Sequence, residues 1–375
     1  MKRGYKKLLI LEIILFFVLI LNSFVSSILS RYNLILALIA VLGIFKLFFG
    51  FEKDRHRYVR DIIFEIAIFL LVFFLLYYLS GLIITFAKAE NYLTWYGFSN
   101  FIIPIILTII LKEIARYMIL QKAEGNNFLL ITTCILFIFL DVSNAIYYNN
   151  FSSKYDSFLF VALSLLPAIS TNIACTYISK KVGYKPVIFY LIIVNIYSYL
   201  MPIIPNPSEY ISSMVQFLLP IALGYRVYSF YEKEKDKEVS RDYNKRRILP
   251  LIIPTIVIMI LIYFVSGYFH YYAVAVASNS MSPKIYRGDV VIIEKIDKNY
   301  DLLEEGQVIA YKYDGIIIVH RLERILKQDG KYYFYTKGDA NSKEDNWTVE
   351  EDMIIGTVNH KISYIGLPTV WLNEL

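Results

Sequence analysis

Nine long apolar runs occupy most of the first 270 residues, and they constrain the fold more than any other feature of the chain. Each run is long enough to cross the hydrocarbon core of a bilayer as a helix. Because 57% of the residues are hydrophobic and only 19% are charged, the composition excludes an ordinary soluble protein. The sequence therefore predicts a polytopic membrane protein. The runs cover residues 8–30, 34–51, 62–87, 101–120, 127–147, 157–178, 186–204, 211–231 and 248–270.

The distribution of Lys and Arg between the runs predicts the orientation. With a cytoplasmic N-terminus, the inside segments hold 20 Lys and Arg residues, whereas the outside loops hold only Arg31, Lys88 and Lys154. Basic residues favour cytoplasmic loops. The chain is thus predicted to be a multi-pass protein of the cell membrane, with an extracytoplasmic C-terminal domain. The net charge of +6 arises from the inside loops and indicates no nucleic-acid partner.

Few charged residues lie within the apolar runs. Lys112, Glu113 and Arg116 fall toward the predicted cytoplasmic end of the fourth run, where we expect them to snorkel to the interface. Asp141 lies deeper and is a candidate functional residue for that reason. Both cysteines, at positions 134 and 175, fall within runs and are expected to be packing residues rather than a disulfide or a metal site.

The pattern changes near residue 274 to short alternating strands separated by turn residues. Asp314-Gly315 and Asp329-Gly330 predict tight hairpins, because both central residues of a type I′ turn need positive φ. The fold predicted is a multi-span α-helical membrane domain followed by a mainly-β extracytoplasmic domain. Strands are expected at Val290–Ile296, Gln307–Tyr313, Ile316–Ile325, Lys331–Lys337 and Ile354–His360.

Three regions follow from these patterns. Residues 1–247 form a membrane domain of about eight spans that ends in a charged cytoplasmic linker, residues 232–247. Residues 248–270 form the final transmembrane anchor, and residues 271–375 form the extracytoplasmic domain. Ser280 lies ten residues beyond the last run, so an extended chain places it within roughly 35 Å of the membrane surface.

Residues able to support nucleophilic catalysis are spread over the β domain. Ser280 is a weak nucleophile until a base takes its proton, and His320 can act as that base near neutral pH. An acid would fix the imidazole, and Asp339 and Asp345 are both candidates. A two-residue turn at 329–330 without a bulge pairs His320 with Asp339. The Ser280 N–H and the Ser278 hydroxyl are candidate donors to an oxyanion.

Four short segments carry a resemblance to a known family. Ser278-Asn-Ser280-Met281-Ser-Pro283 with Arg287-Gly-Asp289 resembles the nucleophile box of type I signal peptidases. Val319-His320-Arg321 is similar to the Ser-His branch found in the endoplasmic reticulum, in archaea and in some Gram-positive bacteria. Residues 336–345 resemble that branch's Gly-Asp-Asn-Asn-x-x-Asp-Asp box, and residues 356–366 its closing strand. The resemblance covers only the C-terminal 100 residues or so and says nothing about residues 1–247.

This resemblance implies the function and the roles of the site residues. It implies a signal peptidase, a serine endopeptidase that removes signal peptides from secreted preproteins near the bilayer and uses no metal or organic cofactor. Ser280 is then the nucleophile, His320 the general base and Asp345 the preferred partner of His320, while Asp339 is an essential or structural acid. Contact with the secretion machinery is a further expectation. The alternatives are a dedicated processing enzyme and a catalytically inactive transporter or sensor.

Overall fold

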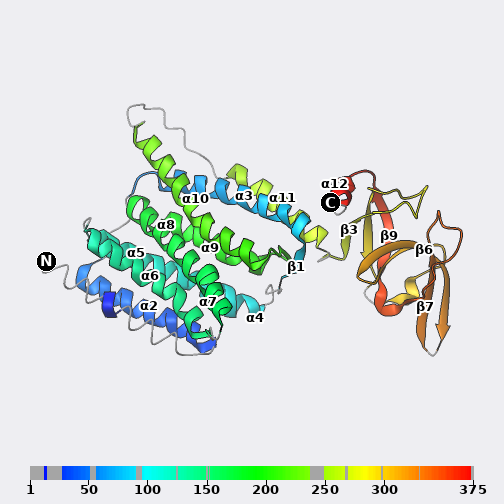
Figure 1. Ribbon diagram of the computed structural model, residues 1–375, viewed down its shortest axis with the longest axis horizontal. Coiled ribbons are helices and arrows are strands. Elements are labelled where there is room, and N and C mark those ends of the chain that lie inside the picture. Colours follow the sequence, from blue (N-terminus) through cyan, green and yellow to red (C-terminus); the bar gives the residue numbers. More distant parts are fainter. Residues whose placement is uncertain are drawn as a thin grey trace. The chain divides into compact units, whose positions relative to one another are not determined.

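The computed structural model describes residues 12–14, 28–50, 56–89, 95–123, 126–148, 151, 153–236, 249–266, 269–296, 299–328 and 330–372. The chain divides into two compact units, one built from helices and one that contains the C-terminal β-sheet (Figure 1). The two units are described separately.

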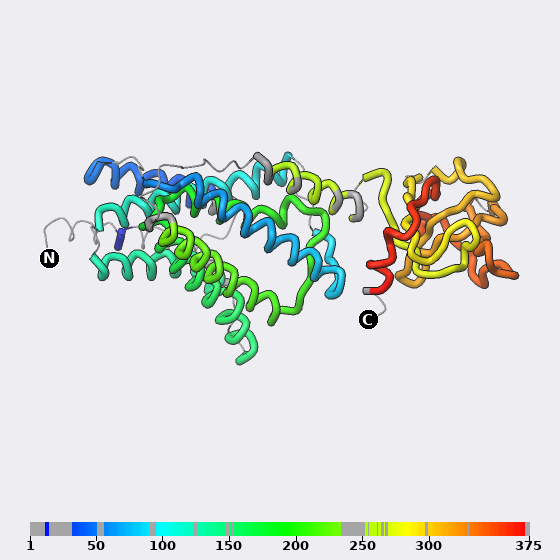
Figure 2. The backbone as a smooth tube through the Cα atoms, turned by 90° about the horizontal axis from the view of Figure 1, so that it is seen from above, coloured from blue at the N-terminus to red at the C-terminus, as the bar shows by residue number. Residues whose placement is uncertain are grey.

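Long helices make up the first unit, and Figure 2 shows several of them running side by side. Two of them are continuous through a π-helical turn, so that α4, η1 and α5 join and α7, η2 and α8 join. The helices before the C-terminal sheet are α2 (Ile28–Phe49), α3 (Val59–Ile84), α4 (Trp95–Gly97), η1 (Phe98–Ile102), α5 (Ile103–Lys122), α6 (Asn127–Tyr148), α7 (Lys154–Phe160), η2 (Val161–Leu165), α8 (Leu166–Val182), α9 (Tyr184–Leu200), α10 (Glu209–Asp236) and α11 (Leu249–Val265). Residues 78–84 of α3 and 256–265 of α11 belong to the second unit.

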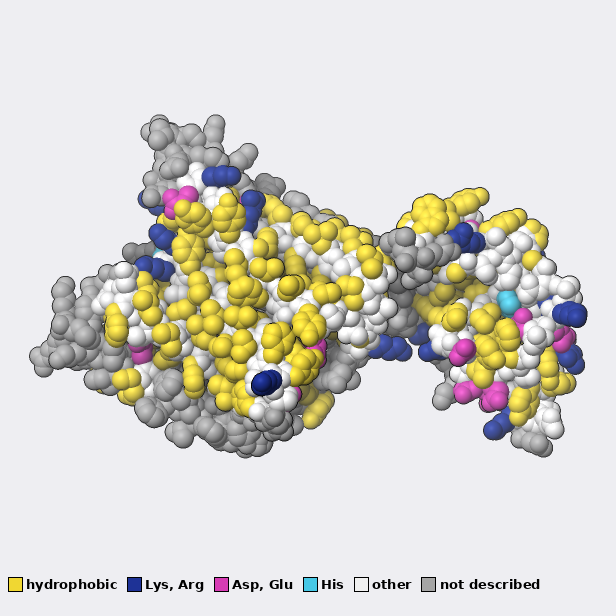
Figure 3. Space-filling view, in the orientation of Figure 1, with side chains coloured by type: hydrophobic (Ala, Val, Ile, Leu, Met, Phe, Trp, Pro, Cys, Tyr) yellow, Lys and Arg dark blue, Asp and Glu magenta, His cyan; other side chains and the backbone are white. Residues whose placement is uncertain are grey.

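Four stretches of helix are long and apolar enough to cross a membrane within the described residues: Tyr32–Phe49, Val59–Ile84, Trp95–Lys122 and Lys154–Val182. Two shorter apolar helices cover Asn127–Ser143 and Tyr184–Leu200. Large hydrophobic side chains point outward from these helices, as on the face shown in Figure 3. Most of the predicted run 8–30 lies outside the described residues. The count of nine spans and their orientation stay predictions.

Charged residues inside the helical unit form a connected network instead of snorkelling. The Glu113 and Arg116 side chains are only 0% and 1% exposed, and they form an ion pair at 2.9 Å. Arg116 also donates to the Asn172 side chain at 2.6 Å, and Asn172 donates to Asp141 at 2.7 Å. Lys112 pairs with Asp141. The expectation that Glu113 and Arg116 snorkel is therefore wrong, because the two side chains pair with each other on α5 and Arg116 also reaches Asn172 on α8.

The β domain contains a seven-stranded antiparallel sheet with the order β3-β4-β9-β5-β6-β7-β8. The five predicted strands are present, and β3 and β8 are additional edge strands. A separate small sheet pairs β1 (Phe86–Lys88) with β2 (Ile203–Pro205). The elements of the β domain are β3 (Tyr271–Ala275), β4 (Val290–Lys295), β5 (Val308–Tyr313), β6 (Ile316–Gln328), β7 (Lys331–Lys337), β8 (Val349–Glu350), β9 (Ile354–Ile362) and α12 (Leu367–Leu372).

Turn chemistry fixes the first predicted hairpin, and a bulge changes the second. Asp314 and Gly315 have φ values of 48° and 81°, as a type I′ turn requires. In the second hairpin Gln328 pairs with Lys331 as predicted, but the register shifts between Leu322 and Arg324. Beyond the bulge, Arg321 pairs with Lys337. The predicted pairing of His320 with Asp339 is thus wrong, because one extra residue on β6 moves the ladder by one position.

Two buried clusters pack on the sheet and hold the surrounding loops. One joins Tyr272 and Val291 to Met281 and Ile285, which belong to the loop between β3 and β4. The other gathers Leu322, Phe334, Val349 and their neighbours around β5, β6 and β7. Met281 is 0% exposed, so the residue next to Ser280 is part of the hydrophobic core. The loop that carries Ser280 is therefore anchored by core packing.

Candidate active site

Ser280 lies in the loop between β3 and β4, and backbone hydrogen bonds fix this loop around it. The Ser282 N–H donates to the Asn279 carbonyl at 3.1 Å, and the Ile285 N–H donates to the Met281 carbonyl at 3.0 Å. From the loop between β7 and β8, the Ala340 N–H donates to the Ser280 carbonyl at 2.8 Å. The buried Met281 side chain points into the core, which leaves the Ser280 side chain partly exposed.

The Ser280 hydroxyl faces the side chain of His320, a residue of β6. Ser280 Oγ lies 3.1 Å from His320 Nε2. His320 Nδ1 lies 2.6 Å from Asp345 Oδ2, and the two side chains are only 9% and 6% exposed. The three groups form a series of two hydrogen bonds, although 65 residues separate the first from the last. A base between a hydroxyl and a carboxylate is the arrangement that activates a serine.

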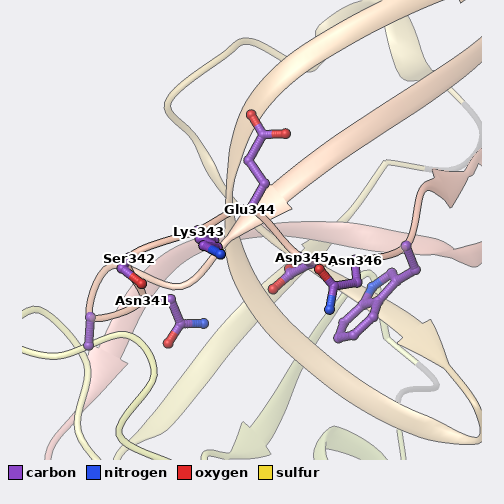
Figure 4. A pocket seen from close by; sticks show the side chains of 8 residues that line it. Asn341, Ser342, Lys343, Glu344, Asp345 and Asn346 are labelled. Atoms are coloured by element: carbon purple, nitrogen blue, oxygen red, sulfur yellow. The ribbon is translucent and has the colours of Figure 1, made fainter.

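Asp345 belongs to the loop that joins β7 to β8. Its backbone N–H donates to the Thr336 carbonyl at 2.9 Å, which ties the loop to the end of β7. An open pocket lies beside it, lined by residues 340–347 (Figure 4). The hydroxyls of Thr336 and Tyr311 both donate to Asp345 Oδ2, at 2.7 and 3.1 Å. The sequence gives no sign of these two hydroxyls, because both are interior residues of ordinary strands.

Asp339 is paired with an arginine and not with His320. Arg321 Nε and Nη2 donate to the two carboxylate oxygens of Asp339 at 2.7 and 2.6 Å. These hydrogen bonds hold the pKa of Asp339 below its ordinary value. Arg321 also donates to the Gly306 carbonyl at 2.6 Å. Ala340, which follows Asp339 in the sequence, donates its N–H to the Ser280 carbonyl. The ion pair between Asp339 and Arg321 therefore fixes the turn that supports Ser280.

Space at that turn is tight. A Cβ added to Gly338 would lie 2.6 Å from the Ser280 carbonyl oxygen and 2.8 Å from the Asn341 side-chain nitrogen. Both distances are too short for a real side chain. The glycine of the Gly-Asp box is therefore required by the close approach of this turn to the Ser280 backbone.

Ser278 is the second hydroxyl at the site. Its Oγ lies 3.1 Å from Ser280 Oγ, and either atom can be the donor. When Ser280 donates to His320, the Ser278 hydroxyl is the donor to Ser280. Ser278 therefore lies next to the Ser280 hydroxyl, and its role as an oxyanion donor stays a prediction.

Asp289 is a buried carboxylate to which the sequence analysis assigned no role. It is 1% exposed and accepts the Tyr286 N–H at 3.0 Å, the Lys361 amine at 3.1 Å and the Tyr364 N–H at 3.3 Å. Burial alone would raise the pKa of Asp289, but these hydrogen bonds hold it below its ordinary value. Asp289 thereby ties the serine loop to the segment after β9. The Arg-Gly-Asp sequence next to the nucleophile box was the available signal.

No group of three or more His, Cys, Asp or Glu side chains in the described part of the chain is placed to hold a metal ion. The groups that the structure brings together at Ser280 are a hydroxyl, an imidazole and a carboxylate. Such a group can carry out acyl transfer.

Comparison with known proteins finds similarity in the C-terminal part of the chain. The family model described as Peptidase S24-like matches residues 254–359. The signal peptidase complex catalytic subunit SEC11C of Homo sapiens is 31% identical over 112 residues. The resemblance to the endoplasmic-reticulum type of signal peptidase is confirmed. The match covers 27% of this chain and 57% of the human protein.

Similar catalytic subunits are found in two further organisms. The signal peptidase complex catalytic subunit SEC11 of Plasmodium falciparum is 32% identical over 111 residues, 58% of its length. That of Yarrowia lipolytica is 33% identical over 111 residues, 63% of its length. The chain thus spans about three-fifths of the length of these relatives. The helices before residue 254 lie outside the family match.

Proposed function

We propose that this chain is a membrane-bound serine endopeptidase that removes N-terminal signal peptides from secreted preproteins. The observation that supports this most is the series of hydrogen bonds from Ser280 Oγ to His320 Nε2, at 3.1 Å, and from His320 Nδ1 to Asp345 Oδ2, at 2.6 Å. The similarity to signal peptidase catalytic subunits supports the same class of substrate.

The proposed reaction begins when Ser280 Oγ attacks the carbonyl carbon at the cleavage site. His320 Nε2 takes the serine proton, and Asp345 accepts the Nδ1–H and stabilises the imidazolium that forms. The Ser280 N–H and the Ser278 hydroxyl donate to the oxyanion. His320 then gives its proton to the leaving amine, and the mature protein departs. Water, deprotonated by His320, hydrolyses the acyl-enzyme and releases the signal peptide.

Membrane placement is part of the proposal. Residues 1–247 form a membrane domain of about eight spans with the cytoplasmic linker 232–247, residues 248–270 anchor the chain, and residues 271–375 lie outside. The bias of Lys and Arg toward the inside loops supports this orientation. Labelling of single cysteines with an impermeant maleimide tests it. A cysteine placed at Ser342 should react in intact cells, whereas one placed in residues 237–247 should react only after lysis.

The decisive experiment compares Ser280→Ala and His320→Ala with the unaltered protein in preprotein cleavage. Both variants should lose cleavage while the full-length protein stays in the membrane at unchanged amount. Wild-type cleavage by Ser280→Ala would refute the nucleophile assignment. Failure of Ser280 to react with a serine-directed acylating probe would favour an inactive transporter or sensor.

The secretome of cells carrying Ser280→Ala separates general from dedicated processing. A dedicated enzyme processes one or a few preproteins, so only those should accumulate uncleaved, whereas loss of a general enzyme should affect many.

A further inference from the structure

All the hydrogen bonds to Asp345 from buried side chains converge on one of its oxygens. Asp345 Oδ2 lies 2.6 Å from His320 Nδ1, 2.7 Å from Thr336 Oγ1 and 3.1 Å from the Tyr311 hydroxyl. Thr336 and Tyr311 are both 0% exposed. Neither hydroxyl has water available in place of these partners, so each is held against the carboxylate by the packing around it.

The hydrogen bonds around Asp345 have a fixed direction. Trp347 Nε1 is a donor only, and it donates to the Tyr311 hydroxyl at 3.3 Å. The Tyr311 hydroxyl in turn lies 3.0 Å from Thr336 Oγ1, and Thr336 donates the shorter bond to Asp345. Burial raises the pKa of Tyr311 to about 12, so its hydroxyl keeps its proton at neutral pH. Each hydroxyl has one proton and donates it to Asp345, while Trp347 donates to the Tyr311 oxygen from behind, so these three protons all point toward the carboxylate.

The bulge in β6 is what places Thr336 on the face of the sheet that carries His320. Opposed residues on antiparallel strands share a face, and alternate residues along one strand do so as well. Thr336 pairs with Leu322, which shares the face of His320. Without the bulge the pairing that begins at Gln328 and Lys331 would set Thr336 opposite Glu323, on the other face. The irregularity thus brings the hydroxyl to the carboxylate.

We propose that Thr336 and Tyr311 are positioning residues that hold Asp345 Oδ2 against His320, an inference that rests on the proposed serine endopeptidase function. They lie behind the carboxylate, with His320 between them and the serine, so they act through Asp345 rather than on the substrate. Without the Thr336 donor the carboxylate is freer to rotate, and its oxygen keeps more negative charge for His320. The imidazolium is then retained to a higher pH, and the neutral base is scarcer at a given pH.

Other charged groups near His320 have to stay constant in the test. These are Asp339 with its partner Arg321, together with Lys284, which interacts with Asp339. None of them is altered by substitution at positions 336 or 311. Thr336→Val keeps the shape of the side chain and removes its hydroxyl, Thr336→Ser keeps the hydroxyl, and Tyr311→Phe removes the second donor.

Preprotein cleavage by the purified full-length protein gives the readout, as kcat, KM and the dependence of kcat/KM on pH. We expect Thr336→Val to lower kcat about tenfold to a hundredfold, the range for a hydrogen bond to a charged group, with KM unchanged. The acidic limb of the profile should move to higher pH. Thr336→Ser should restore kcat and the acidic limb of the pH profile to their wild-type values. Tyr311→Phe should show the same changes as Thr336→Val to a smaller extent.

Tyr272→Phe is the matched control, because Tyr272 is a buried tyrosine of the other core cluster. It should leave the profile unchanged. A wild-type kcat and pH profile in folded Thr336→Val would overturn the proposal, and so would an equal shift in Tyr272→Phe. If Thr336→Val does not fold, Tyr311→Phe decides by the same criteria. Cleavage that survives Ser280→Ala would instead refute the proposed function, so the two failures are distinguishable.

Discussion

Replacement of Asp345 by asparagine tests whether this residue is the acid that serves His320. The donors around Asp345 dictate how the amide would lie. Thr336 and Tyr311 both need an acceptor at the Oδ2 position, so the amide oxygen takes that position and the amide nitrogen takes the other. His320 then keeps its partner and its tautomer. The substitution removes only the negative charge.

The cost follows from the charge lost beside the imidazolium. Nδ1 and Oδ2 are 2.6 Å apart in a nearly buried site, and the centres of the two delocalised charges lie farther apart than these two atoms. Two unit charges at about 4 Å interact by about 4 kcal/mol at an effective dielectric constant of about 20. This energy is available only once His320 has taken the serine proton. We therefore expect Asp345→Asn to lower kcat about a thousandfold with little change in KM.

Single-turnover cleavage of a preprotein by the full-length protein measures the effect, and thermal unfolding verifies the fold. Asp339→Asn is the comparison, because its charge is already neutralised by Arg321 and it does not contact His320. It should lower the unfolding temperature more than Asp345→Asn does and reduce kcat less. A loss below tenfold for Asp345→Asn, or a greater loss of kcat for equally folded Asp339→Asn, would refute the reasoning.

Two further predictions concern the support around Ser280. Arg321 lowers the pKa of Asp339 in the folded protein. The ion pair therefore stabilises the fold fully at pH values above the pKa of Asp339 in the unfolded chain, about 3.9, and this stabilisation is lost as the pH falls through the pKa of Asp339 in the folded protein. The unfolding temperature should thus drop below about pH 4, and Asp339→Asn should make this drop smaller; an identical acid profile in that variant would contradict the assignment. Gly338→Ala places a methyl group 2.6 Å from the Ser280 carbonyl oxygen and should reduce cleavage at least tenfold, whereas Gly43→Ala, which has nothing within 4 Å of its added carbon, should not. Equal cleavage by the two glycine variants would show that the turn at 338 does not set the position of the serine.

Local patterns were sufficient to predict most of the β domain. The alternation of apolar and polar residues gave the five inner strands, and Asp314-Gly315 gave a tight turn, since both signals depend on neighbours in the chain. The edge strands were missed for physical reasons. β8 has only two residues, and β3 begins directly after the predicted apolar run 248–270, so the sequence pattern did not separate the two. Long apolar runs predicted helices, but their length says nothing about which charges pair inside them.

Long-range geometry was the part that the sequence could not supply. Pairing Asp339 with His320 required a regular ladder, and nothing in Leu322-Glu323-Arg324 distinguishes a bulge from an ordinary strand. The family pattern preferred Asp345, and Asp345 is the acid that lies 2.6 Å from His320. The importance of Thr336 and Tyr311 could not be identified, because it depends on burial and on partners far along the chain.

Burial of Met281 has a consequence for how long the site survives. A flexible loop would let the serine leave its partners many times while the rest of the domain stayed folded. Here the loop cannot open without drawing a fully buried side chain out of the core, so its fluctuations are coupled to those of the sheet. Hydrogen exchange at residues 281–285 should accordingly approach the rate of the surrounding strands. The loop that carries Ser280 should then unfold only when the surrounding sheet unfolds.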